Sequence, residues 1–206
     1  MSPLALPNLN LPGADLREAD LRRAELSGCR LSGADLTGAR LDYATLDRAQ
    51  LDGAMLDGAQ MTGVSLRRAT LERSRLYYTQ IVEGDLRQTN LRYSRISGAD
   101  LKSIYLTESD LSHAKLVLSV LTSGYLDYCD LRSADLAGAD LRHVDLTGAD
   151  LTDANLTQAR LDGANLSGAN MTNVSMQDAS FGDVTVDDYT QMPDDLRKAI
   201  EAASAG

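Results

Sequence analysis

The sequence predicts an all-β solenoid of square cross-section, a parallel β-helix whose chain turns a corner every five residues. The first observation is the period: from Leu11 to Val186 every fifth residue is apolar, and 29 of these 36 centres are Leu. The second is that 20 of the 35 positions lying two residues before a centre, from Ala14 to Val184, are Ala. The third is that 12 of the 16 glycines lie two residues after a centre. A period held through so many steps indicates an internal repeat, which outranks local secondary-structure patterns.

A five-residue period fits neither a helix, with its period of 3.6, nor a strand, with its period of 2. Four sides of five residues close a square coil of 20, with the centre and the small residue pointing inward. Successive coils stack through β-type hydrogen bonds about 4.8 Å apart, so about nine coils form a rod on the order of 40 Å long. Glycine after the centre suits a corner that needs an unusual φ.

The composition fits a narrow interior and excludes several classes of protein. The chain has 206 residues, of which 43% are hydrophobic, with one Phe and no Trp. It has no apolar run of about 18 residues and no basic segment typical of a secretory signal. The 30 acidic residues against 20 basic ones, a net charge of −10, argue against direct binding to nucleic acid or to an anionic membrane. Two cysteines indicate a reducing compartment, and we expect a cytoplasmic protein.

Several five-residue units carry the same three letters. Ala14-Asp15-Leu16, Ala34-Asp35-Leu36, Ala134-Asp135-Leu136, Ala154-Asn155-Leu156 and Ala164-Asn165-Leu166 resemble the A(D/N)LXX motif of the pentapeptide-repeat family. The resemblance covers most of the chain and implies a right-handed quadrilateral β-helix. It implies diverse roles: some members resemble DNA in shape and charge and bind DNA gyrase, which gives quinolone resistance, while others regulate development or act as secreted effectors.

The two ends of the solenoid are expected to carry caps, because open coil edges promote aggregation. We assign residues 1–10 to an N-terminal cap, 11–186 to the pentapeptide-repeat β-helix, and 187–206 to a C-terminal capping helix and tail. Near the C-terminus, Pro193 followed by two acids is typical of the start of a short α-helix. Its apolar face either lies over the last coil or forms a homodimer contact, and it consists of Leu196, Ala199 and Ile200.

Charge is distributed unevenly along the rod. Residues 1–126 carry 15 basic and 15 acidic side chains, whereas residues 127–206 carry 5 basic and 15 acidic ones. The acidic-surface candidates precede a centre and ring the rod: Asp110, Asp130, Asp135, Asp140, Asp145 and Asp150. They are either the ordinary Asp of the repeat or a surface that imitates a phosphate backbone for a DNA-binding partner, such as DNA gyrase or another topoisomerase.

The middle of the rod departs most from the repeat, with apolar and aromatic residues at outward positions. Tyr105 and Tyr125 are 20 residues apart, so their rings are expected to stack one coil apart. Such a surface is either sequence drift or a docking site for a protein partner. Its candidate residues are Tyr77, Tyr78, Tyr105, Val117, Leu118, Tyr125 and Tyr128.

No catalytic, metal or cofactor site is expected. His113 and His143 project from opposite sides of the square, and Cys29 and Cys129 lie inward, five coils apart. The pattern therefore predicts a non-enzyme without cofactors. Two functions are open: an acidic DNA-mimicking protein that binds DNA gyrase or another topoisomerase, or a general scaffold that docks a protein partner through its Tyr-rich surface.

Overall fold

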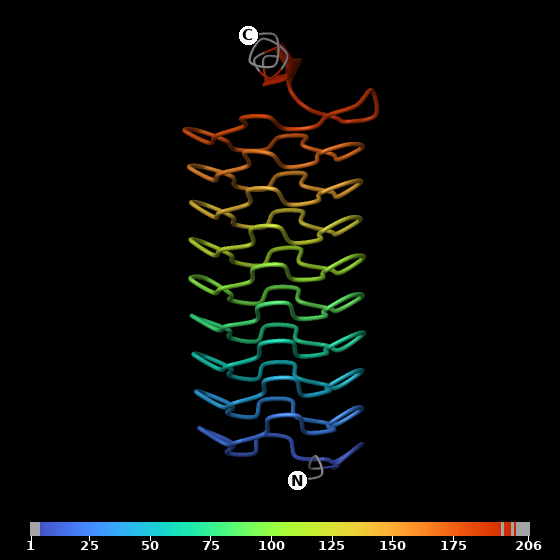
Figure 1. The fold of residues 1–206 in the computed structure, drawn as a ribbon, viewed down its shortest axis with the longest axis vertical. Helices are drawn as coiled ribbons and strands as arrows, with labels where there is room; N and C mark the ends of the chain where they lie inside the picture. The colour runs from blue at the N-terminus through green and yellow to red at the C-terminus, as the bar shows by residue number, and fades with distance from the viewer. Residues whose placement is uncertain (1–4, 195, 199, 201–206) are drawn as a thin grey trace.

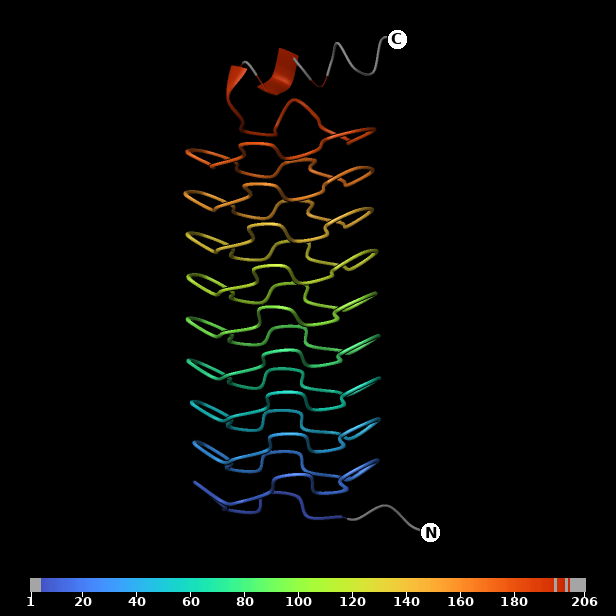
Figure 2. The same cartoon turned by 90° about the vertical axis from the view of Figure 1, so that its left-hand side faces the viewer.

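The protein is a straight stack of square coils with the chain termini at opposite ends (Figure 1). The structure, a computed structural model, describes residues 5–194, 196–198 and 200. A second view, turned by 90°, shows the same straight stack, with a short helix lying across its C-terminal end (Figure 2). The chain is thus a β-solenoid, as the period predicted.

Each side of a coil forms a β-bridge one residue long with the next coil, so the strands are minimal. Parallel bridges join residues 20 apart, beginning with Ala5 and Glu25. The last bridge joins Asn170 to Gln191, which is 21 apart, so one extra residue enters the final coil. The lap of 20 residues is therefore confirmed up to this point. The total of about nine coils and the three segment boundaries stay predictions.

The corners are tight turns with one fixed backbone conformation. Within a turn, the carbonyl of a centre accepts the N–H of the residue three positions later, as from Ala34 to Leu31 at 2.9 Å. The third turn residue has a positive φ at every such position from Asn8 to Asp183, as in a type II turn. Glycine occupies 12 of these positions, and non-glycine residues occupy the other 24.

The interior is filled by the centres and by the small residues that precede them. Leu36 and Ala34 are fully buried, and the pattern continues along the rod. Where hydroxyls replace Ala, most donate to a backbone carbonyl, as Ser109 does to Leu86 at 2.7 Å. A void of about 10 Å³ lies between the apolar centres from Leu76 to Leu111, which is too small for a ligand.

The two ends of the rod differ. At the C-terminal end, helical residues at 194, 196–198 and 200 follow Pro193, and the buried Leu196 and Ile200 belong to the core. Arg197 fixes this helix by donating to the carbonyl of Thr190 at 2.6 Å. Ala199, which was expected on the same face, lies outside the described residues.

At the N-terminal end the first coil is less well covered. Five inward leucines pack against the core but are partly exposed: Leu6, Leu9, Leu11, Leu16 and Leu21. Full burial begins at Ala24. Residues 1–4 of the expected cap lie outside the described residues.

Candidate functional site

The six candidate aspartates share one local contact. Each accepts, through Oδ1, the backbone N–H of the residue two positions later, at 2.9 to 3.3 Å. Asp110, for example, accepts from Ser112 at 2.9 Å. Asn165 and Asn155 make the same contact, so the charge itself is not needed for the turn. This explains why Asp and Asn alternate at this position of the repeat.

Three of the aspartates form a column along one side of the rod. Asp130 bridges to Asp110 below it and to Asp150 above it. Two arginines lie among them: Arg132 pairs with Asp130 and approaches Asp150 at 3.9 Å, and Arg92 approaches Asp110 at 3.8 Å. The hydrogen bonds from Arg132 lower the pKa of Asp130 below its usual value. The column is therefore partly neutralised within the chain.

The other three candidates lie on the remaining sides of the coil. Asp140 pairs with Arg142 at 2.6 Å, which lowers the pKa of its carboxyl. Asp135 accepts from the side chain of Asn155 at 3.0 Å, and Asp145 accepts from the hydroxyl of Thr147. The six aspartates thus surround the rod rather than converge on one point.

The expected aromatic stack is present on the side that begins at residue 105. The rings of Tyr105 and Tyr125 lie 5.0 Å apart and are nearly parallel, with an interplanar angle of 1°. Their exposed fractions are 41% and 45%. Their partner-binding role stays a prediction.

The remaining apolar candidates occupy two other corners of the coil. Tyr78 and Leu118 are exposed on one corner, beside Tyr77 and Val117. Tyr128 is ten residues, or half a coil, beyond Leu118 and therefore lies at the opposite corner. The structure divides the seven candidates between separate surfaces.

A second ring stack was missed by the sequence analysis. The rings of Tyr93 and His113 lie 4.8 Å apart at an interplanar angle of 4°. The guanidinium groups of Arg73 and Arg92 lie 5.2 and 5.5 Å from the Tyr93 centroid, within cation–π range. The 20-residue spacing of residues 73, 93 and 113 is the signal that identifies this ladder.

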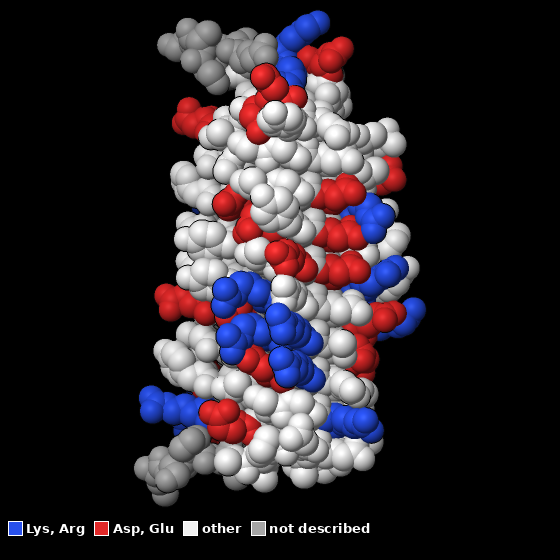
Figure 3. All heavy atoms as spheres, turned by 90° about the vertical axis from the view of Figure 1, so that its right-hand side faces the viewer, with Lys and Arg blue, Asp and Glu red and all other residues white. Residues whose placement is uncertain are grey.

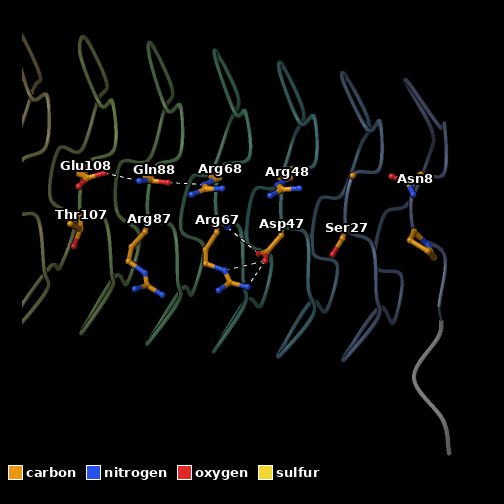
Figure 4. A pocket seen from close by; sticks show the side chains of 12 residues that line it. Asn8, Ser27, Asp47, Arg48, Arg67, Arg68, Arg87, Gln88, Thr107 and Glu108 are labelled. Carbon is orange, nitrogen blue, oxygen red and sulfur yellow. Dashed lines mark hydrogen bonds and ion pairs between the residues drawn. The ribbon is translucent and has the colours of Figure 1, made fainter.

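A basic groove was also missed. It runs along one corner in the N-terminal half and encloses about 770 Å³ (Figure 4). We call it the arginine groove; it is lined by Pro7, Asn8, Ser27, Gly28, Asp47, Arg48, Arg67, Arg68, Arg87, Gln88, Thr107 and Glu108. Its four arginines form two pairs spaced by 20 residues, which the sequence already contained. In the middle of one face, a cluster of basic side chains lies below several acidic ones (Figure 3).

Two arginines of the groove are held by carboxylates. Arg67 donates to Asp47 through Nε at 3.0 Å and through Nη2 at 2.5 Å. Burial by itself raises the pKa of Asp47, but hydrogen bonds from Arg67 and Ser65 outweigh it, and the net shift is downward. Arg87 is held in the same way by Asp85 at 2.6 Å.

The other two arginines have no carboxylate partner among the described residues. Arg68 donates to Gln88 at 2.7 Å, and Gln88 in turn donates to Glu108 at 2.7 Å. The guanidinium group of Arg48 makes no hydrogen bond or ion pair within the described part of the chain. The groove therefore presents cationic groups that are free to bind an anion.

Groups that could perform chemistry are either buried or isolated. Burial raises the pKa of Cys129 to about 12, and its thiol donates to the carbonyl of Leu106. His113 and His143 occupy opposite corners of the coil. Among the residues that the structure describes, no group of three or more His, Cys, Asp or Glu side chains is placed to hold a metal ion. No helix in this described part has the length and apolar character needed to cross a membrane.

Comparisons with known proteins give a consistent result. The model of pentapeptide repeats matches eight copies, over residues 6–38, 34–73, 85–122, 119–153 and 149–185. Among solved structures, QnrB1, a plasmid-mediated fluoroquinolone resistance protein, is similar with a TM-score of 0.76 and 16% identity, covering 98% of this chain and 100% of that one. The pentapeptide repeat protein Rfr23 from the cyanobacterium Cyanothece 51142 is similar with a TM-score of 0.55 and 25% identity, covering 55% of this chain and 91% of that one. Among curated proteins, none matches this chain significantly in sequence.

Proposed function

The chain belongs to the pentapeptide-repeat family, and we propose that it is a non-enzymatic binding solenoid whose acidic surface engages a topoisomerase such as DNA gyrase. Pentapeptide-repeat proteins are generally structural or interaction proteins, and the filled Leu/Ala interior offers no substrate pocket among the described residues. The fold similarity to QnrB1 makes a role in fluoroquinolone resistance the leading specific hypothesis. The proposal places the protein in the cytoplasm with its partner.

The observation that carries the proposal is the distribution of charge. The whole net charge of −10 falls within residues 127–206. One column of carboxylates, spaced one coil or about 4.8 Å apart, consists of Asp110, Asp130 and Asp150. This spacing is of the same order as the distance of about 3.4 Å between phosphates of one DNA strand along the helix axis. Arginines that hold phosphates also form strong paired hydrogen bonds with carboxylates. A topoisomerase surface built for DNA would therefore bind this column.

The test uses purified gyrase, relaxed plasmid and the full chain. The native protein is expected to inhibit supercoiling, or to relieve quinolone-induced cleavage, at micromolar concentration. The triple variant Asp130→Asn, Asp140→Asn and Asp150→Asn is expected to weaken the effect at least tenfold. Asn keeps the turn contact, as Asn165 does, so the fold is retained.

A matched control lies at the other end of the rod. Asp15, Asp20 and Asp35 also precede a centre, and they contact Arg17 and Arg22 as the test residues contact Arg132 and Arg142. Their triple Asn variant is expected to keep the native effect on gyrase. No effect of the native protein at micromolar concentration, or equal losses in both triple variants, would contradict the proposal.

A second candidate function rests on the Tyr105–Tyr125 stack, an exposed aromatic surface of the kind that protein partners bind. In this alternative the solenoid is a general scaffold. To distinguish this aromatic surface from the acidic one, the gyrase experiment also includes the variant Tyr105→Ala with Tyr125→Ala. Loss of the gyrase effect in this variant alone, with unchanged far-UV circular dichroism, would assign the contact to the aromatic surface instead of the acidic one.

A further inference from the structure

One corner of the rod carries uncompensated charges of both signs. In its lower half, Arg48 and Arg68 lack a carboxylate partner within the described residues. In its upper half, Glu108 accepts only from Gln88, and Asp127 accepts from the hydroxyl of Thr107, with no cation beside either in that same part of the chain. Like charges stacked between neighbouring coils destabilise the rod. The corner is thus incompletely balanced by its own chain.

The sign of the charge changes at a defined level of this corner. In the two columns of turn residues, the arginines end at Arg87, and apart from Asp47, which holds Arg67, the acidic residues begin at Glu108. In Figure 3, a cluster of basic side chains in the middle of one face lies below several acidic side chains. The two halves of the corner are therefore complementary to each other, but they are separated along the rod and cannot meet within one molecule.

We propose that a second copy of this chain occupies the arginine groove, in an antiparallel two-fold pairing of the two rods. A two-fold axis perpendicular to the rod keeps each column opposite the same column and reverses the order of the coils. With the axis between the levels of residues 87 and 107, Arg67 faces Asp127 of the second copy. By the same register, Arg68 faces Tyr128, whose ring is 62% exposed and offers a cation–π contact.

The straight stack of coils in Figures 1 and 2 allows two rods to lie side by side over several coils. The exposed ion pairs that the arginines form within the chain contribute little to stability, so they can rearrange at an interface. A DNA backbone fits the groove less well than a second copy, because Glu108 and Asp127 continue the same corner and would repel phosphates. In this register the second copy supplies Asp127 to Arg67 and Tyr128 to Arg68, while Glu108 faces Gln88 and lies next to the level of Arg87.

Sedimentation velocity of the full chain tests the pairing. We expect a dimer at about 0.1 M salt and at least a tenfold larger dissociation constant at about 1 M salt, where the screening length falls from about 10 to about 3 Å. Arg67→Glu with Arg68→Glu is expected to give a monomer, and so is Glu108→Lys with Asp127→Lys. All four side chains are turn residues outside the core, and far-UV circular dichroism verifies that each variant folds.

The decisive variant combines all four reversals in one chain, which restores complementarity and is expected to restore the dimer. Arg22→Glu with Arg23→Glu, the same change of charge on another corner, is the matched control and is expected to leave the dimer intact. A native protein that is monomeric at both salt concentrations, or a quadruple variant that stays monomeric, overturns the proposal. So does a monomer whose groove binds a short DNA duplex in fluorescence anisotropy and loses it with Arg67→Glu and Arg68→Glu.

Discussion

At the scale of the residue, the third position of each turn is the most demanding site in the molecule. Twenty-four non-glycine side chains adopt a positive φ there, among them Leu118 and Tyr78. For an L-residue this conformation costs roughly 1–2 kcal/mol. The cost is tolerated because every turn is fixed by the bridges to its neighbouring coils, and because several large side chains at these positions lie over glycines. The ring of Tyr78, for example, covers Gly98, where an added Cβ would lie 2.6 Å from Cε1.

Gly33 isolates the conformational part of this cost. Its φ is +67°, and an added Cβ would meet no atom within 4 Å. Gly33→Ala is therefore expected to lower the free energy of unfolding by about 1 kcal/mol through the backbone alone. Gly33→Asn is expected to lower it less, because Asn tolerates this conformation and already adopts it at Asn173. Urea unfolding measures the order; a smaller loss for Ala than for Asn would contradict it.

At the scale of the element, the short C-terminal helix packs against the core at the end of the rod. Leu196 and Ile200 are 8% and 4% exposed and pack against the core, while Arg197 binds the backbone of the preceding turn. These contacts are satisfied within one chain. They favour the capping interpretation of this segment over a homodimer contact through it.

Leu196→Ala separates the two interpretations. For a cap, we expect the free energy of unfolding to fall by about 2–3 kcal/mol, because a buried leucine is lost. The dissociation constant measured by sedimentation is expected to stay unchanged. Lys198→Ala, on the exposed side of the same helix, is the control and is expected to change neither quantity. A variant of unchanged stability that dissociates would establish the dimer contact instead.

The regular elements were predictable from the sequence because the repeat leaves little freedom. A Leu every fifth residue, with Ala two before it, determines which residues are inside, and the 20-residue lap then places Tyr125 above Tyr105. The arginine groove was missed because the negative net charge of the chain conceals a local excess of positive charge at Arg48 and Arg68. The arginines among the acidic column were missed because side-chain reach, as from Arg132 to Asp150, depends on rotamers that no periodicity specifies.

At the scale of the whole molecule, the free energy of unfolding depends on pH in the acidic range, because guanidinium groups hold many of the carboxylates. Hydrogen bonds from Arg17 lower the pKa of Asp15 to about 2, and those from Arg22 lower the pKa of Asp20 to about 2. Arg132 shifts the pKa of Asp130 in the same direction. A carboxyl whose pKa is lower in the folded state stabilises the fold above its unfolded pKa, near 3.9, and loses this contribution as the pH falls through the folded value.

We therefore expect the free energy of unfolding to fall between about pH 4 and about pH 2, from this source. Arg17→Gln with Arg22→Gln is expected to reduce the slope over this interval, because the pKa values of Asp15 and Asp20 return toward normal. Urea unfolding at a series of pH values measures the slope. An identical slope in the double variant would show that these pairs do not contribute.

The lap of 20 residues makes the length of the molecule a separate variable from its surface. Removing one whole lap, residues 145 to 164, would shorten the rod by one coil and leave every remaining column aligned. The arginine groove and the C-terminal helix would be unchanged. Removing a single quintet would instead rotate everything beyond the cut by a quarter turn and redistribute its surface features onto new faces. Gain and loss of whole coils is thus the route by which such a chain can change the length of its rod while keeping its surface columns aligned.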